Sequence, residues 1–236
     1  MRRLMCAMVW AAAIGVALLA GCSSVIVDSN LTRRQAVCEN QPPDVSPDAQ
    51  ERLELVDVRY YGFDGKEHQG QVVINKGLAG DIRKVFAVIL ESRFPVASVL
   101  PVAHPEIQKK GLYGLSPNTN NTSAYVWRPV TGGRKPSMHS FGLAIDINPR
   151  QNPYIRGERV LPPGSRYDPT APGTLTPDSP VVRAFKAMGW TWGGDWAALG
   201  LLDYMHFEKI PPDQEDWVRR RLVGGLKVDE SAARRD

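Results

Sequence analysis

Two short stretches of the sequence place histidines beside carboxylates in apolar surroundings. The first contains His139 and Asp146, and the second contains Asp203, His206 and Glu208. Two imidazoles and one carboxylate, with a fourth position left for water, form a recognised catalytic zinc set. Zinc lowers the pKa of bound water to about 7, which makes hydroxide available at neutral pH. The residue types therefore indicate metal-assisted hydrolysis, but their spacing alone does not separate a metal site from buried core histidines.

The surroundings of Asp146 favour a bound cation or an ion pair. Asp146 lies in the apolar run 143–147, which predicts a buried strand, and a buried carboxylate is costly unless it is paired or bound to a metal. An arginine partner is the alternative to a metal. His139 lies seven residues before Asp146, so on one regular strand the two side chains would face opposite sides. We expect Gly142 to bend the chain between them.

The second stretch has the same geometric requirement. Asp203 and His206 are three residues apart, so they too would diverge on a regular strand. We expect Asp203 to lie in the turn before the strand, where its side chain can reach what His206 binds. A carboxylate there can take a proton from water and pass it to the departing amine. His206 and Glu208 share one face of the strand.

Hydrophobic spacing predicts the elements that must position these residues. Strands are interleaved irregularly with few helices, which favours an α+β fold with a central antiparallel sheet, flanking helices and long loops. Long loops inside a compact domain are often functional. The expected strands cover 56–60, 71–75, 96–102, 142–148 and 203–210, the expected helices start near 47, 80, 179 and 212, and the long loops cover 103–137 and 149–178.

The N-terminus indicates export and a lipid anchor. Residues 1–21 have the basic start and the apolar stretch of a signal peptide, and the stretch is too short for a comfortable membrane span. The run Leu-Ala-Gly before Cys22 resembles a bacterial lipoprotein cleavage site, with Cys22 as the lipidated residue. An ordinary secretory signal with a chance cysteine is the alternative. Residue 24 is serine and no aspartate stands beside Cys22, which favours the outer membrane facing the periplasm.

The rest of the sequence predicts one domain. After a polar tether at 22–46, residues 47–223 are enough for a single core, and 224–236 form a charged tail. Cys38 has no intrachain partner, so the exported fold must rest on its core and on any metal that it binds. The net charge of +4, without a basic stripe, argues against nucleic acid as a partner. We expect a monomer.

The first histidine stretch resembles the motif of a known peptidase family. Ser137-x-His139-x-x-Gly142-x-Ala144-x-Asp146 agrees, at every fixed position, with the zinc motif of the D-alanyl-D-alanine carboxypeptidase family. This family includes D,D-dipeptidases, D,D-carboxypeptidases and L-alanyl-D-glutamate endopeptidases. Its fold is similar to that of lysostaphin-type peptidases and of the hedgehog signalling domain.

The resemblance extends to the second stretch and covers about residues 54–210. Asp203-x-x-His206 resembles the acidic-x-x-His element of the family, in which many members have Glu at the first position. The runs Trp-Gly-Gly-Asp-Trp at 192–196 and His-Phe-Glu at 206–208 are similar to the endopeptidase and carboxypeptidase-like branch. That branch commonly has Asp at the first position of the acidic-x-x-His element.

The resemblance implies a role for each of five residues. It implies that His139, Asp146 and His206 bind zinc and that Asp203 is the general base. Arg128 matches the arginine that precedes the zinc motif and stabilises the tetrahedral oxyanion. A positive donor there helps most when negative charge develops in the transition state.

Further residues are candidates for support of the site. Ser137 is expected to support it through a hydrogen bond, and Asp195 either orients a ligand histidine or caps a short helix. Asn121 and Ser123 lie in a segment that resembles a substrate-side loop. His68 follows a hairpin turn, and we expect it to be structural or exposed.

The expected function is zinc-dependent hydrolysis of a peptide bond in peptidoglycan stem peptides. The enzyme would be either a D,D-carboxypeptidase that trims a terminal D-alanine or an endopeptidase that cuts an L-alanyl-D-glutamate or a D,D bond. Pocket shape in the two long loops would decide between them. A hypothesis of a different class is a non-catalytic envelope lipoprotein that binds peptidoglycan through the same cleft.

Overall fold

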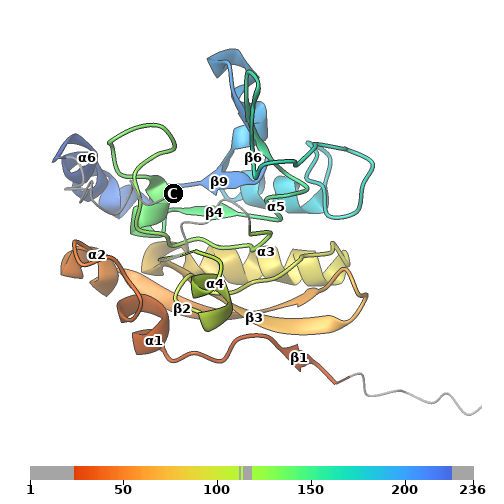
Figure 1. Ribbon diagram of the computed structural model, residues 1–236, viewed down its shortest axis with the longest axis horizontal. Coiled ribbons are helices and arrows are strands. Elements are labelled where there is room, and N and C mark those ends of the chain that lie inside the picture. The colour runs from red at the N-terminus through yellow and green to blue at the C-terminus, as the bar shows by residue number, and fades with distance from the viewer. Residues whose placement is uncertain (1–23, 112, 114–118, 225–236) are drawn as a thin grey trace, which may run out of the picture.

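The computed structural model describes residues 24–111, 113 and 119–224. The predicted signal peptide, the lipidation site at Cys22 and all but the first residue of the predicted charged tail lie outside the described residues. Within these ranges, no helix is long and apolar enough to cross a lipid bilayer. Helices and strands are mixed along the chain, which confirms the α+β class, but three small sheets take the place of one central sheet (Figure 1).

A long hairpin and one helix form one layer of the molecule. β2 (Leu53–Tyr61) and β3 (Glu67–Asn75) pair antiparallel along their whole length. Every second side chain from Val56 to Tyr60 is buried, as expected of a strand with one face on the core. The buried residues of α3 (Ala79–Glu91) recur at helical spacing and pack against β2. In Figure 1, α3 lies between this hairpin and β4 with β9.

A second sheet carries two of the predicted metal ligands. Across the sheet, its strands are β4 (Ala144–Asp146), β9 (His206–Glu208) and β7 (Thr191–Trp192), and all pairs are antiparallel. Phe207 of β9 stacks on Phe185 of α5 (Pro180–Ala187), with the ring centroids 4.0 Å apart. Because Phe207 faces the core, its neighbours His206 and Glu208 point to the opposite face.

A third small sheet supplies Asp203. Across the sheet, its strands are β6 (Arg159–Leu161), β5 (Tyr154–Arg156) and β8 (Leu202–Asp203). The hairpin β5–β6 lies inside the segment that the sequence predicted as an irregular loop at 149–178. The single strand expected at 203–210 is wrong, because β8 and β9 are short strands that belong to different sheets.

The segment expected to be a tether packs against the domain. β1 (Ile26–Val27) pairs parallel to the edge of β3, and α1 (Arg33–Cys38) buries Val37 in the core. Thr32 begins α1 with a capping box, in which side chain and backbone exchange hydrogen bonds. The prediction of a polar linker is therefore corrected for residues 24–46. The composition of this segment is mostly polar, but a few apolar side chains pack against the domain.

One predicted strand does not form. Residues 96–102 make only an isolated bridge, between Val99 and Thr122, in place of a ladder. Pro95 precedes this segment and Pro101 lies within it, and neither has an N–H to donate, which is unfavourable for a paired strand.

The remaining described elements are short. They are α2 (Pro47–Glu51), η1 (Lys76–Leu78), α4 (Pro105–Gln108), η3 (Met138–Phe141), η4 (Gly193–Leu199), η5 (Pro212–Gln214) and α6 (Glu215–Gly224). The helix expected near 47 is α2, and the helix expected from 212 consists of η5 followed by α6. One core extends from Ile74 of the hairpin through Leu143 to Phe207.

Candidate metal centre

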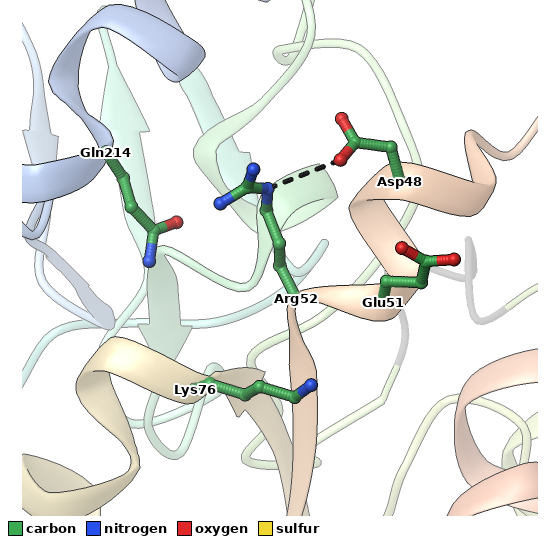
Figure 2. Close-up of a pocket in the computed structure, with 5 residues that line it drawn as sticks. All are labelled: Asp48, Glu51, Arg52, Lys76 and Gln214. Atoms are coloured by element: carbon green, nitrogen blue, oxygen red, sulfur yellow. Dashed lines mark ion pairs between the residues drawn. The ribbon is translucent and has the colours of Figure 1, made fainter.

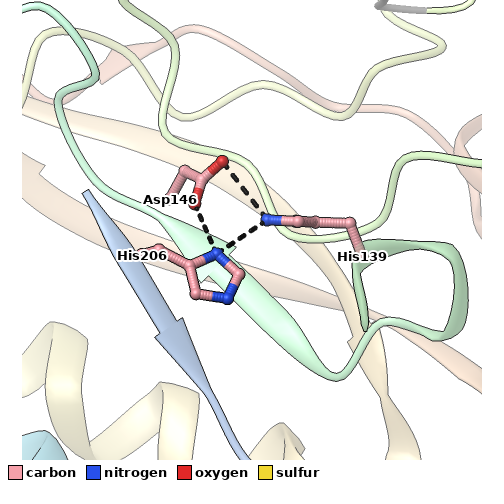
Figure 3. A group of neighbouring side chains, drawn as sticks. All are labelled: His139, Asp146 and His206. Atoms are coloured by element: carbon pink, nitrogen blue, oxygen red, sulfur yellow. Dashed lines mark hydrogen bonds and ion pairs between the residues drawn. The ribbon is translucent and has the colours of Figure 1, made fainter. Parts of the chain in front are cut away.

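Three side chains from η3, β4 and β9 meet at one point (Figure 3). His139 Nε2 lies 3.2 Å from His206 Nδ1 and 3.2 Å from Asp146 Oδ2. His206 Nδ1 lies 3.1 Å from Asp146 Oδ1. One ligand atom from each residue lies within 4.8 Å of the other two. The three residues that were expected to meet around a single cation are therefore brought together by the fold.

A glycine turns the chain between the first two ligands. The Ser137 hydroxyl accepts a hydrogen bond from the backbone N–H of His139 at the start of η3, and Gly142 ends this helix with φ of +63°. A Cβ on Gly142 would lie 2.7 Å from the backbone nitrogen of Asn75. Only glycine fits both the backbone conformation and the close approach to β3. The bend lets His139 and Asp146 face one point despite their odd spacing.

The other two ligands are cross-strand neighbours. Asp146 of β4 is the direct partner of His206 of β9 in the antiparallel ladder, so both side chains leave the sheet on the same face. The next pair, Ile145 and Phe207, is fully buried on the core side. The side chains of Asp146 and His206 remain 18% and 10% exposed, so the site is open to solvent.

Each ligand histidine uses its second ring nitrogen for a hydrogen bond. His139 Nδ1 lies 2.6 Å from the carbonyl oxygen of Ala124, and because a carbonyl only accepts, Nδ1 carries the proton. His206 Nε2 lies 3.0 Å from Glu208 Oε2, which makes Nε2 the donor there. The ring nitrogens that face Asp146 are thus the ones that can offer a lone pair to a metal.

The three ligands influence one another's protonation. Burial lowers the pKa of His139 and outweighs the opposing effect of Asp146. Burial acts in the same direction on His206, but the hydrogen bonds to Asp146 and Glu208 raise its pKa to about 10. Burial acts to raise the pKa of Asp146, but the two histidines hold it far below its usual range. Without a cation the site therefore keeps a proton on His206, and a metal must displace that proton.

Asp203 lies beside the ligands, and one of its carboxylate oxygens has no structural role. It ends β8, and its Oδ1 is buried and has no hydrogen-bond partner within the described part of the chain. Burial raises the pKa of Asp203 to about 7. The charge of Asp146 acts in the same direction as burial, whereas the charge of His206 opposes it. A carboxylate that titrates near neutrality is suited to exchanging protons with water.

Two glycines let η4 pack against β8, the strand that ends at Asp203. A Cβ on Gly193 would lie 2.8 Å from the Cβ of Asp203, and a Cβ on Gly194 would overlap the ring of Trp192. The indole Nε1 of Trp192 donates a hydrogen bond to the carbonyl oxygen of Tyr204 at 2.8 Å. The Trp-Gly-Gly run and the Asp-x-x-His element are therefore parts of one packed unit.

Arg128 lies within electrostatic reach of the site. Its positive charge lowers the pKa of Asp203, against the effect of burial. It also lowers the pKa of His139, in the same direction as burial. The Ser140 hydroxyl holds its backbone, donating to the Arg128 carbonyl at 2.7 Å and accepting from the Arg128 N–H at 3.1 Å. The guanidinium donates to the carbonyl oxygen of Pro129 at 3.2 Å. The half-buried cation is thus held near the triad.

The other predicted site residues have structural contacts. Asn121 is buried, and its amide group exchanges hydrogen bonds with the backbone of Leu100, so it does not face a substrate. Ser123 pairs through its backbone with β4. Asp195 forms an ion pair with Lys186 at 2.7 Å and, among the contacts of the described residues, touches neither ligand histidine. The expectation that Asp195 orients a ligand is therefore corrected.

Two residues beside His206 were given no role in the site by the sequence analysis. Glu208 bonds its ring, and the indole ring of Trp196 has its centroid 5.4 Å from that of the imidazole. The period of two along β9, which puts His206 and Glu208 on one face, was a usable signal for Glu208. Trp196 lies in η4, where no periodic pattern indicates the direction of the side chain.

An open pocket of about 250 Å³ lies apart from these residues (Figure 2). Asp48 and Arg52 on its wall form an ion pair of 3.5 Å. The charges of its lining are mixed and favour no single class of ligand. The lining residues are Asp48, Glu51, Arg52, Lys76 and Gln214.

The site has the composition of a mononuclear metal centre beside a free carboxylate, which is the class of site found in metal-dependent hydrolases. Residues 131–209 match the model of the D-alanyl-D-alanine carboxypeptidase family, which supports the family that the two motifs indicated. The match covers about a third of the chain and contains His139, Asp146, Asp203 and His206, whereas Arg128 precedes it. Comparisons with curated proteins and with solved structures gave no match. The coarse function is therefore that of a peptidase.

Proposed function

We propose that this protein is a zinc-dependent peptidase that hydrolyses a peptide bond in the stem peptides of peptidoglycan. One observation carries the proposal: His139, Asp146 and His206 meet at one point, and Asp203 lies beside them with a buried oxygen that has no hydrogen-bond partner in the described structure. The family match supports the reaction class, because it covers all four residues.

The donor set fits zinc. Two imidazole nitrogens and one carboxylate oxygen are typical ligands of catalytic zinc, which keeps a further position open. Both imidazoles are oriented by hydrogen bonds at their other nitrogen, as is usual for metal ligands. When bound, zinc supplies Lewis-acid activation of water and of the scissile carbonyl group.

Asp203 moves the proton in this proposal. Its pKa is about 7 in the metal-free site, and a bound cation would lower it, so the carboxylate is ionised at neutral pH and can accept a proton from the attacking water. A new bond forms between the water oxygen and the carbonyl carbon, and the carbon–nitrogen bond then breaks. The proton held by Asp203 passes to the departing amine, so Asp203 ends the cycle ionised.

Arg128 stabilises the oxyanion. The carbonyl oxygen of the substrate gains negative charge as water attacks, and a fixed cation nearby lowers the energy of that state more than that of the ground state. The half-buried Arg128, whose backbone is held by Ser140, supports this role because the cation needs little rearrangement when the charge develops.

Digestion of purified sacculi, with mass spectrometry of the soluble products, tests the proposal. Loss of a single terminal D-alanine would define a D,D-carboxypeptidase, whereas cut stems or opened crosslinks would define an endopeptidase. Removal of zinc with a chelator should stop cleavage, and added zinc should restore it. A protein that binds zinc and sacculi but releases no product would instead be the non-catalytic envelope lipoprotein.

The Asp203→Ala variant tests the assignment of the base. It should retain zinc but cut about 10²- to 10⁴-fold more slowly, which is the usual contribution of general acid–base catalysis. Asp64→Ala is a control, because the Asp64 side chain is 44% exposed and pairs with His68, away from the ligands. Normal cleavage by Asp203→Ala would show that another group takes the proton.

We further propose that the protein is exported and is held by a lipid on Cys22, at the outer membrane facing the periplasm, as a monomer. The support is the apolar stretch and the Leu-Ala-Gly run before Cys22. Such an anchor would keep the site beside its polymeric substrate. Metabolic labelling with palmitate should mark the protein, and the Cys22→Ala variant should remain unlabelled.

A further inference from the structure

β9 places two polar side chains on one face, and only one of them is a metal ligand. His206 and Glu208 are separated by Phe207, which is fully buried in the core. Glu208 Oε2 lies 3.0 Å from His206 Nε2, the ring nitrogen that does not face His139 and Asp146. Glu208 therefore contacts the ligand His206 without being part of the triad.

We propose that Glu208 is a positioning residue for the metal centre. By accepting a hydrogen bond from Nε2–H, its carboxylate fixes the tautomer and the ring orientation of His206, so that Nδ1 offers its lone pair to the metal. A carboxylate at this position also makes the imidazole a stronger ligand. The role rests on the proposed function, since it requires that the triad binds zinc.

The sheet holds Glu208 in place for this role. β9 is the middle strand, so the backbone of Glu208 is paired with Ala144 on one side and with Thr191 on the other. The Thr191 hydroxyl also donates to the Glu208 carbonyl oxygen at 3.2 Å. Ala144, the direct cross-strand partner of Glu208, carries only a methyl group on the same face of the sheet.

The exposure of the pair distinguishes it from an ordinary surface contact. The imidazole of His206 is 10% exposed and the carboxylate of Glu208 is 32% exposed. Ion pairs between fully exposed side chains contribute little, whereas this bond joins a largely buried ring to a carboxylate at the rim. The other ligand histidine, His139, is held by the main-chain carbonyl of Ala124, which a substitution cannot remove. Glu208 is thus the acceptor that mutagenesis can delete.

Zinc affinity of the purified protein, measured by competition with a chromophoric chelator, tests this role. Glu208→Ala removes the acceptor and should weaken zinc binding about 10- to 100-fold. Glu208→Gln keeps an oxygen acceptor at the same place and should recover most of that loss. Glu54→Ala is a matched control and should bind zinc normally, because Glu54 lies on a strand, is 35% exposed and pairs with Arg83.

Nitrogen-15 NMR of the histidines adds a readout that a merely destabilised variant would not reproduce. In the zinc-loaded protein, His206 should carry its proton on Nε2, and that proton should exchange slowly with solvent. The slow exchange should persist in Glu208→Gln and disappear in Glu208→Ala. Thermal unfolding of both variants verifies that they remain folded.

The outcomes separate the positioning role from the proposed function. Equal zinc affinity of Glu208→Ala and the unchanged protein would overturn the role and leave the proposed function intact. A loss in Glu208→Gln as large as in Glu208→Ala would also overturn it, because the acceptor would still be present. Failure of the unchanged protein to bind zinc would overturn the proposed function, and the role with it.

Discussion

His68 and His206 are both surrounded by carboxylates, but their surroundings differ in one respect. His68 Nδ1 lies 2.9 Å from Asp28 Oδ2, and its Nε2 lies 3.2 Å from Asp64 Oδ1, so the two carboxylates are on different sides of the ring. At His206, in contrast, one ring nitrogen meets a carboxylate and a second imidazole at the same point. Among the described residues, only the group of His206 brings three ligand atoms together.

The comparison teaches that convergence, and not the mere proximity of histidine and aspartate, distinguishes a metal site. The His68 cluster has a different role, because it joins the N-terminal segment to the hairpin. Tyr60 donates its hydroxyl to Asp28 at 2.6 Å, and its ring stacks on His68 with the centroids 5.4 Å apart. Of two clusters of similar composition, one thus joins two segments of the fold, and the other has the geometry of the proposed metal site.

Removal of a histidine from each cluster should give the largest difference between them. His139→Ala should weaken zinc binding by more than about 100-fold, because a ligand contributes more than an outer partner of a ligand, and should abolish cleavage of sacculi. His68→Ala should keep the zinc content and the activity of the unchanged protein. Zinc is measured by mass spectrometry of the metal after dialysis. Loss of zinc from His68→Ala would contradict the division into two clusters.

Substitution of the glycines beside the two clusters should also have the larger effect at the His206 cluster. Gly142→Ala should reduce the free energy of unfolding by about 2–5 kcal/mol, because it adds the strain of a positive φ to a steric clash. Gly65→Ala, in the hairpin turn near His68, also has a positive φ, of +73°, but its new Cβ would meet no atom within 4 Å. It should cost about 1–2 kcal/mol. Urea denaturation measures both, and equal costs would show that Gly142 is needed for its φ alone.

The pH dependence of stability should have opposite signs in the two regions. The folded-state pKa of Asp203, about 7, lies above its ordinary value of 3.8, so its stabilising effect is complete below about pH 4 and is lost as the pH rises through 7. Metal-free Asp203→Asn should therefore be more stable than the unchanged protein at pH 8, by about 1–4 kcal/mol, with little difference at pH 4.

Asp64 provides the contrast. The backbone N–H of Lys66 lowers the pKa of Asp64, so its contribution is present above its ordinary pKa and is lost as the pH falls. Asp64→Asn should be slightly less stable than the unchanged protein at pH 8. Urea denaturation after chelator treatment, at both pH values, measures the four differences. A stabilised Asp64→Asn or a destabilised Asp203→Asn would reverse the assigned signs.

Zinc affinity should rise with pH. Metal-free His206 has a pKa of about 10, whereas burial lowers the pKa of His139, so zinc must displace a proton from His206 between pH 6 and 8. Affinity should rise by at least about tenfold per pH unit in this range. Chelator competition at several pH values measures the slope. An affinity that does not change with pH would contradict the protonation of metal-free His206.

Much of the site was predictable because the decisive constraints are local. Gly142 shows this best: the odd spacing of His139 and Asp146 required a bend, and glycine was the residue that allows one. The pairing of β9 with β4 and the placement of β8 in another sheet were not predictable, because strands of two or three residues are selected by tertiary contacts and not by their own sequence. Asn121 was misread for a similar reason, since nothing in its polar surroundings revealed that the loop is buried.

The docking of β1 on the hairpin limits where such an enzyme could work. Ile26 is already part of a strand, and only four peptide steps separate it from Cys22. An extended chain covers at most about 3.6 Å per step, so a lipid on Cys22 would hold the domain within about 14 Å of the bilayer. The reach of the anchored domain would then exceed its own diameter by at most about 14 Å, and wall layers farther from the membrane would remain uncut until a longer spacer were inserted before Ile26.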